Sequence, residues 1–223
     1  MKSKIFISTT ILVFLFGSTN AFSQQHVVSY DLSKLLSAHL LSISNREATV
    51  LPGHEKNGIM LSAKDDDGVA WINGITFTNG IIELDIRGKN VDQQSFLGVA
   101  FHLVDAKTLD AVYFRPFNFL SADSVHRIHM VQYVSHPQYP WFVLRDKFNA
   151  QYEKEITSPP DPNQWFHVRI EVQYPQITVF INGRKTPCLS VKQLNDRKSG
   201  KLGLWVGNGS GGAFANLKVT FLK

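Results

Sequence analysis

Short runs in which apolar and polar residues alternate recur through most of this chain. In residues 81–87, Ile82, Leu84 and Ile86 alternate with charged residues, and successive side chains of a strand point to opposite faces. Further runs with strand-like composition cover residues 96–104, 111–117, 127–134, 165–173, 177–181, 203–206 and 215–222. One helical spacing of leucines, in residues 32–40, predicts a short amphipathic helix or an irregular strand.

Glycine, asparagine, aspartate and proline separate these runs, and Asn182-Gly183 is a tight-turn signal. Many short strands without alternating helices favour an all-β fold, an antiparallel β-sandwich or jelly roll, over an α/β fold. The proline cluster at residues 159–162 is interpreted as a loop, because the strand pattern continues on both sides of it. We therefore expect a single β-sandwich domain over residues 24–223. The residues expected to form or border its core are Trp165, Phe180, Leu204, Trp205 and Phe214.

The first residues have the pattern of a secretory signal peptide. Lys2 and Lys4 precede an apolar stretch over residues 5–16, and small residues follow up to Ser23. This stretch is shorter than the roughly 20 residues that span a bilayer, and the only cysteine is Cys188. We expect residues 1–23 to be removed and the protein to be secreted or periplasmic, without a membrane anchor.

Composition excludes several classes of protein. A hydrophobic fraction of 43% and sixteen Phe exclude a disordered chain, and one cysteine excludes a disulfide scaffold. The net charge is +5, and loss of the signal peptide would remove two lysines. The densest basic group consists of Lys192, Arg197, Lys198 and Lys201. Because this group lacks interleaved aromatics, we expect no nucleic-acid partner.

Four C-terminal segments follow one another in a characteristic order: residues 163–172 around Trp165, the hairpin 177–183, residues 200–207 ending after Leu204-Trp205, and residues 212–219. This order resembles the laminin G-like and concanavalin A-like lectin/glucanase superfamily. The resemblance implies a jelly-roll β-sandwich.

The middle of the chain resembles one branch of that superfamily, the secreted 3-keto-disaccharide hydrolase domains. Arg115 follows Tyr113-Phe114, and Gln132 stands in a second strand-like run, as in the pattern of that branch. Met130 stands where the pattern has a glutamate. The resemblance covers about residues 58–223 and implies a carbohydrate ligand, whereas Met130 weighs against catalysis.

The stretch from Tyr113 to Arg145 contains the side chains that sugar sites use. Aromatic rings pack on the apolar faces of sugars, and amides, imidazoles and guanidinium groups bind hydroxyls. The candidate substrate-binding residues are Tyr113, Arg115, Asn118, Gln132, Tyr133, His136, Trp141 and Arg145. His129 is the candidate base if the protein is an enzyme. The alternative is that these residues pack a long loop.

Other motifs are interpreted as structural. Glu83-Leu84-Asp85 resembles the start of the catalytic motif of family 16 glycoside hydrolases, but Gly88 replaces its last glutamate, so a solvated strand face is favoured. His126, His129, His136 and His167 lack metal-ligand spacing. The run Asp65-Asp66-Asp67-Gly68 lacks the full pattern of a calcium loop and is interpreted as a solvated turn. We expect no cofactor, with calcium or another divalent metal left open.

Three functions agree with this pattern. The first is a secreted glycan-binding domain, and the second is a hydrolase or lyase acting on 3-keto-disaccharides or related glycosides. The third is a protein-interaction module. Binding needs no acid/base pair, so Met130 and Gly88 favour the first.

Overall fold

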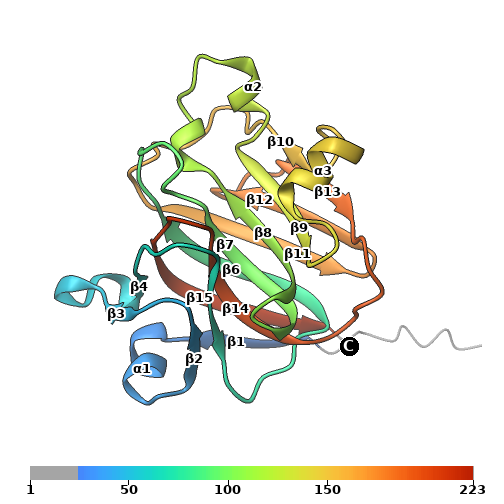
Figure 1. The fold of residues 1–223 in the computed structure, drawn as a ribbon. Helices are drawn as coiled ribbons and strands as arrows, with labels where there is room; N and C mark the ends of the chain where they lie inside the picture. The colour runs from blue at the N-terminus through green and yellow to red at the C-terminus, as the bar shows by residue number, and fades with distance from the viewer. Residues whose placement is uncertain (1–24, 223) are drawn as a thin grey trace, which may run out of the picture.

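The computed structural model describes residues 25–222, which form two antiparallel β-sheets packed face to face (Figure 1). The helices are α1 (Leu32–Ser37), α2 (Ser124–Arg127), α3 (Trp141–Lys147) and the 3-10 helices η1 (Pro52–Asn57) and η2 (Pro116–Asn118). The strands are β1 (His26–Tyr30), β2 (Leu41–Ser44), β3 (Ala48–Val50), β4 (Ile59–Leu61), β5 (Gly68–Ile72), β6 (Asn79–Arg87), β7 (Leu97–Asp105), β8 (Thr108–Phe114), β9 (Val131–His136), β10 (Glu153–Lys154), β11 (Phe166–Gln173), β12 (Gln176–Ile181), β13 (Leu189–Lys192), β14 (Lys201–Val206) and β15 (Gly212–Leu222).

One sheet has eight strands in the order β13-β12-β11-β6-β15-β4-β3, with β1 paired to β15. The other has seven strands in the order β10-β9-β8-β7-β14-β5-β2. Neighbouring strands in both sheets of the described chain run antiparallel. The predicted antiparallel β-sandwich is confirmed.

The alternation predicted for residues 81–87 identifies the face of β6 that packs against the core. Ile82, Leu84 and Ile86 are fully buried between the sheets. β11 pairs with β6 so that Val168 lies opposite Leu84 and Ile170 opposite Ile82. Burial of each such side chain stabilises the fold by about 1.5–3 kcal/mol. Of the residues predicted to form or border the core, Leu204, Trp205 and Phe214 are buried and Trp165 and Phe180 are half-buried.

The seven-stranded sheet is apolar on both faces. Val112 and Phe114 of β8 point into the core between the sheets, whereas Ala111 and Tyr113 belong to a second apolar cluster on the outer face. Leu144 of α3 packs into this second cluster, and Figure 1 shows α3 beside β9. Loops and helices therefore cover part of the outer face.

Residues 127–134 do not form one strand. Asp123 caps α2 by accepting a backbone hydrogen bond in its first turn, the helix ends at Arg127, and β9 begins only at Val131. The prediction of a strand over residues 127–134 is therefore wrong for its first half, and Arg127 and His129 both precede the strand.

Two other boundaries also differ from expectation. The predicted strand 111–117 stops at Phe114, since Pro116 begins η2 and proline has no N–H for a sheet. Residues 141–147, which lie outside every predicted strand and helix, form α3. Of the two alternatives for residues 32–40, a short helix or an irregular strand, the structure has the helix, α1, which Asp31 caps by accepting from the Lys34 N–H.

No helix in residues 25–222 is long and apolar enough to cross a membrane. The predicted signal peptide, residues 1–23, lies outside the described residues. β1 begins at His26 and pairs with β15.

Candidate functional site

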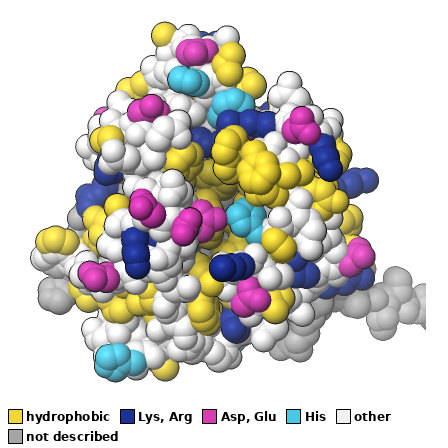
Figure 2. Space-filling view, viewed as in Figure 1, with side chains coloured by type: hydrophobic (Ala, Val, Ile, Leu, Met, Phe, Trp, Pro, Cys, Tyr) yellow, Lys and Arg dark blue, Asp and Glu magenta, His cyan; other side chains and the backbone are white. Residues whose placement is uncertain are grey.

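A cleft of about 360 Å³ opens on the outer face of the seven-stranded sheet. Figure 2 shows hydrophobic side chains in the hollow and charged side chains along its edges. This volume is in the range of small-molecule sites. The lining residues are Asp67, Gln93, Phe96, Tyr113, Arg115, Phe117, Asn118, Val125, His126, His129, Trp141, Arg145, Trp205, Gly207 and Asn208.

Four aromatic rings follow one another along the cleft. The ring centroids of Tyr113 and Trp205, on β8 and β14, are 4.9 Å apart. Phe96 lies 6.3 Å from Tyr113 and 5.2 Å from Phe117, which meets it edge to face. Ring faces of this kind pack against the apolar faces of sugars and against other flat groups.

One buried carboxylate holds the polar side of the cleft together. Glu153 of β10 is 2% exposed, and it accepts hydrogen bonds of 3.1 and 3.2 Å from Nε and Nη2 of Arg145. His129 Nδ1 lies 2.7 Å, and Arg115 Nη1 3.6 Å, from Glu153 Oε2. Glu153 therefore positions Arg145 and His129, which both reach the cleft.

Arg115 lines the base of the cleft and is almost fully buried there, with an exposed fraction of 3%. Its guanidinium lies 4.8 Å from the centre of the Tyr113 ring and donates to the Tyr113 hydroxyl and to Gln132 Oε1. Tyr113 donates in turn to Gln132 Oε1 at 2.7 Å. Burial raises the pKa of Tyr113 to about 12, so the phenol is neutral. This network fixes the floor of the cleft.

Asp67 enters the cleft from the turn before β5. Arg46 holds that turn, since its Nη2 donates to the carbonyl oxygens of Asp66 and Gly207 at 2.6 and 2.9 Å. Burial raises the pKa of Asp67 to about 6, although the Arg46 charge opposes the shift. His136 Nδ1 lies 3.7 Å from Asp67 Oδ2, which places an imidazole beside this carboxyl group.

The two imidazoles have pKa values shifted in the other direction. Burial lowers the pKa of His129, with Glu153 opposing the shift. Burial and the nearby Arg197 charge lower the pKa of His136. Both rings are therefore neutral at pH 7, and Asp67 keeps a proton to higher pH than an ordinary carboxyl group. A carboxyl group that keeps its proton and an imidazole that stays neutral are the forms that a general acid and a general base need.

A family model described as the 3-keto-alpha-glucoside-1,2-lyase-like domain matches residues 42–220. The chain belongs to this family. The resemblance to 3-keto-disaccharide hydrolase domains is thereby confirmed. No curated protein matches the chain.

Solved structures share the fold of this family member at low sequence identity. A carbohydrate-binding module, CBM66 from Bacillus subtilis, is 16% identical with a TM-score of 0.57, and the match covers 80% of this chain and 94% of the module. The lumenal domain of VIP36, bound to Ca²⁺ and Man₃GlcNAc, is 9% identical with a TM-score of 0.54, covering 82% and 84%. A candidate glycosyl hydrolase from Parabacteroides distasonis is 14% identical with a TM-score of 0.51, covering 83% and 89%.

The cleft brings together most of the site residues predicted from the sequence. Those that line it are Tyr113, Arg115, Asn118, His129, Trp141 and Arg145. Gln132 lies directly beneath, bonded to Tyr113 and Arg115, and His136 lies beside Asp67.

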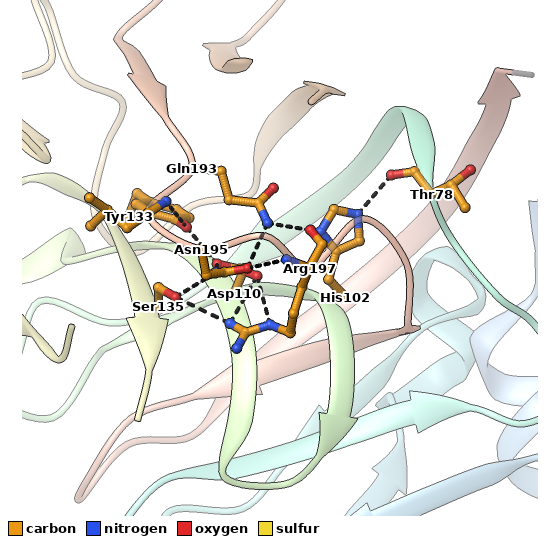
Figure 3. A network of polar contacts seen from close by, with 9 residues as sticks. Thr78, His102, Asp110, Tyr133, Ser135, Gln193, Asn195 and Arg197 are labelled. Carbon is orange, nitrogen blue, oxygen red and sulfur yellow. Dashed lines mark hydrogen bonds and ion pairs between the residues drawn. The ribbon is translucent and has the colours of Figure 1, made fainter. Parts of the chain in front are cut away.

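Tyr133 is the exception, because it points into the space between the sheets. Its hydroxyl donates to Asp110 Oδ1 at 2.5 Å, and Arg197 Nη2 binds Asp110 Oδ2 at 3.0 Å. Asn195 Nδ2 binds both Asp110 Oδ1 and Ser135 Oγ at 2.6 Å. Figure 3 shows these side chains converging on Asp110. Tyr133 thus belongs to a buried polar network and not to the cleft lining.

Sequence reasoning missed two central residues, Asp67 and Glu153. Asp67 was interpreted as part of a solvated turn, and Asp65 and Asp66 are indeed exposed, while only Asp67 turns inward. Glu153 stands in a polar run near Glu155, which is exposed. No local pattern distinguishes the buried glutamate from the exposed one.

The acidic pair Glu83 and Asp85 lies on the outer face of the eight-stranded sheet, away from the cleft. Lys218 contacts Glu83 at 2.6 Å, and His167 Nδ1 contacts Asp85 at 2.9 Å. Because both carboxylates are paired with basic side chains on the outer face of β6, the structure agrees with the interpretation of Glu83-Leu84-Asp85 as a strand face and not a catalytic motif. Within residues 25–222, no three His, Cys, Asp or Glu side chains gather as a metal site.

Proposed function

We propose that the cleft on the seven-stranded sheet binds a carbohydrate. The observation that carries this proposal is the aromatic floor of Tyr113 and Trp205, which shares one cavity with the hydrogen-bonding groups of Asp67, Arg145 and Asn208. Such a combination binds both the apolar faces and the hydroxyls of sugars. Membership of the family and the fold shared with a carbohydrate-binding module and a mannose-bound lumenal domain support it.

A thermal-shift screen of glucosides, their 3-keto forms and oligosaccharides tests the proposal, because a ligand of the folded state raises its stability. Trp141→Ala should reduce the shift without changing the unliganded melting temperature, since this cleft residue is 49% exposed. Phe142→Ala is the matched control, because Phe142 is similarly exposed, at 57%, and does not line the cleft. Arg115→Ala is unsuitable, since it would leave a buried network unpaired.

A screen without any shift would contradict carbohydrate binding and favour the protein-interaction module. Equal loss of the shift in Trp141→Ala and Phe142→Ala would place the ligand outside the cleft.

A second candidate function is a lyase that acts on 3-keto-glucosides. The specific observations in its favour are the matching family and the opposite pKa shifts of Asp67 and His129 in one cleft. Met130, which stands where the family pattern has a glutamate, does not weaken this second candidate function, because its side chain is buried in the core between the sheets.

The chemistry needs a base, an acid and a cation. A carbonyl group at C3 acidifies the proton on C2, and neutral His129 would accept that proton. Arg145 would stabilise the negative charge that develops on the C3 oxygen. The C1–O bond then breaks as C1=C2 forms and the C3 carbonyl returns, and protonated Asp67 would donate its proton to the departing oxygen. The raised pKa of Asp67 favours its protonated form, and the lowered pKa of His129 favours its neutral form, as these two roles require.

Comparison of leaving groups tests these roles. His129→Ala should lower turnover of methyl and phenyl 3-keto-α-glucosides alike, by about a hundredfold or more. Asp67→Asn should slow the methyl compound strongly and the phenyl compound little, since phenolate leaves without protonation. Wild-type turnover of the methyl compound should fall as the pH rises through about 6, where Asp67 loses its proton. Full turnover in His129→Ala would contradict the lyase.

We also propose that residues 1–23 are a signal peptide and that the domain works outside the cytoplasm. The basic start, the short apolar stretch and the small residues up to Ser23 support this.

A further inference from the structure

The mouth of the cleft carries large apolar side chains that water reaches. Val125 of α2 and Trp141 of α3 both line the cleft, yet their exposed fractions are 58% and 49%. They come from two separate excursions of the chain, one between β8 and β9 and the other between β9 and β10. Exposed apolar groups that border a cavity are typical of binding surfaces.

This rim is continuous with the aromatic side of the cleft. Phe117 lines the same cavity and lies 5.2 Å from Phe96, which in turn reaches Tyr113 on the floor. The ionisable groups Asp67 and Arg145 line the cavity as well. The cavity therefore offers one ligand both a polar part and an apolar part.

We propose that this apolar rim, Phe117, Val125 and Trp141, binds an aromatic aglycone of a glycoside whose sugar occupies the polar part of the cleft. The proposal rests on carbohydrate binding by the cleft and names the class of compound. A second sugar ring would need partners for its hydroxyls, and the Arg145 guanidinium, which lies 4.9 Å from the centre of the Trp141 ring, is already bonded to Glu153. A flat arene needs no such partners and packs well against aromatic and aliphatic side chains.

Calorimetry with methyl α-glucoside, phenyl α-glucoside and maltose, each also in its 3-keto form, tests the inference. If the protein turns a compound over, the KM of that compound is compared in place of its Kd. The phenyl compound should bind about tenfold more tightly than the methyl compound, as expected for an added apolar group in a pocket. Val125→Ser and Trp141→Ala should remove most of this preference. Leu120→Ser is the matched control, because Leu120 is 67% exposed and does not line the cleft.

Equal affinities for the phenyl and methyl compounds, or tighter binding of maltose, would overturn the aglycone proposal while carbohydrate binding stands. A preference that survives in Val125→Ser and Trp141→Ala would also overturn it, because the arene would then bind elsewhere. If none of the compounds binds, both proposals fail.

Discussion

His129 Nδ1 lies 2.7 Å from Glu153 Oε2, where the short strand β10 pairs with β9. The same carboxylate binds Arg145 of α3. Through this one side chain, the segment before β9, the helix after it and β10 are fixed to each other. The geometry of the polar side of the cleft therefore depends on a residue that does not line it.

Replacement of Glu153 should destabilise the fold. Glu153→Ala leaves the guanidinium of Arg115 buried without its carboxylate, and removal of one partner from a buried ion pair costs about 3–5 kcal/mol. The free energy of unfolding in urea measures this loss.

Glu155→Ala is the control for Glu153→Ala. Glu155 pairs with Arg127 at 3.4 Å, and its side chain is 47% exposed, so its loss should cost at most about 1 kcal/mol. Equal effects of the two substitutions would show that Glu153 does not hold the cleft together.

Asp67 should make stability depend on pH in a defined direction. Its pKa is about 6 in the fold, against an ordinary value of 3.8. Between these values the folded state binds more protons than the unfolded state, so this contribution to stability falls as the pH rises. The melting temperature of Asp67→Asn minus that of the wild type should therefore increase from about pH 4 to about pH 7.

Asp65→Asn serves as the control for Asp67→Asn, since Asp65 is exposed in the same turn. A difference between Asp67→Asn and the wild type that stays constant with pH would contradict a raised pKa of the half-buried Asp67.

Tyr133→Phe should lower stability and leave ligand binding unchanged. The substitution removes the hydroxyl that donates to buried Asp110 at 2.5 Å, and an unsatisfied buried partner costs about 1–3 kcal/mol. Urea denaturation and calorimetry with the best ligand of the screen measure the two effects. A loss of ligand affinity in a Tyr133→Phe variant that remains folded would show that Tyr133 takes part in ligand binding.

Processing at the N-terminus can be checked by intact mass. Expression of the full chain in a bacterium with a secretory pathway should yield a periplasmic form that begins near Phe22 or Gln24, without lipid. A cytoplasmic product that retains Met1 would contradict the signal peptide.

The β-sandwich could be predicted because the residue pattern of each strand lies within a short stretch of the sequence. In β6 the alternation of Ile82, Leu84 and Ile86 with charged residues assigns each side chain to a face, and neighbouring runs repeat the same rule. Predictions failed where a local signal was overridden or absent. Residues 127–134 have strand composition, but Asp123 begins a helix before them, and β9 starts only at Val131.

The cleft was predicted in part, for a related reason. Tyr113 and Trp141 are residue types that sugar sites use, and they are close in the sequence, so composition indicated the region. Asp67 and Glu153 reach the same place from the loop before β5 and from β10, and no local pattern marks either of them. Acidic side chains look alike in a sequence, whether solvated, like Glu155, or buried against guanidinium groups, like Glu153. Only the pairing of distant strands decides which of them water reaches, and that pairing therefore sets the charge and the pKa values of the cleft.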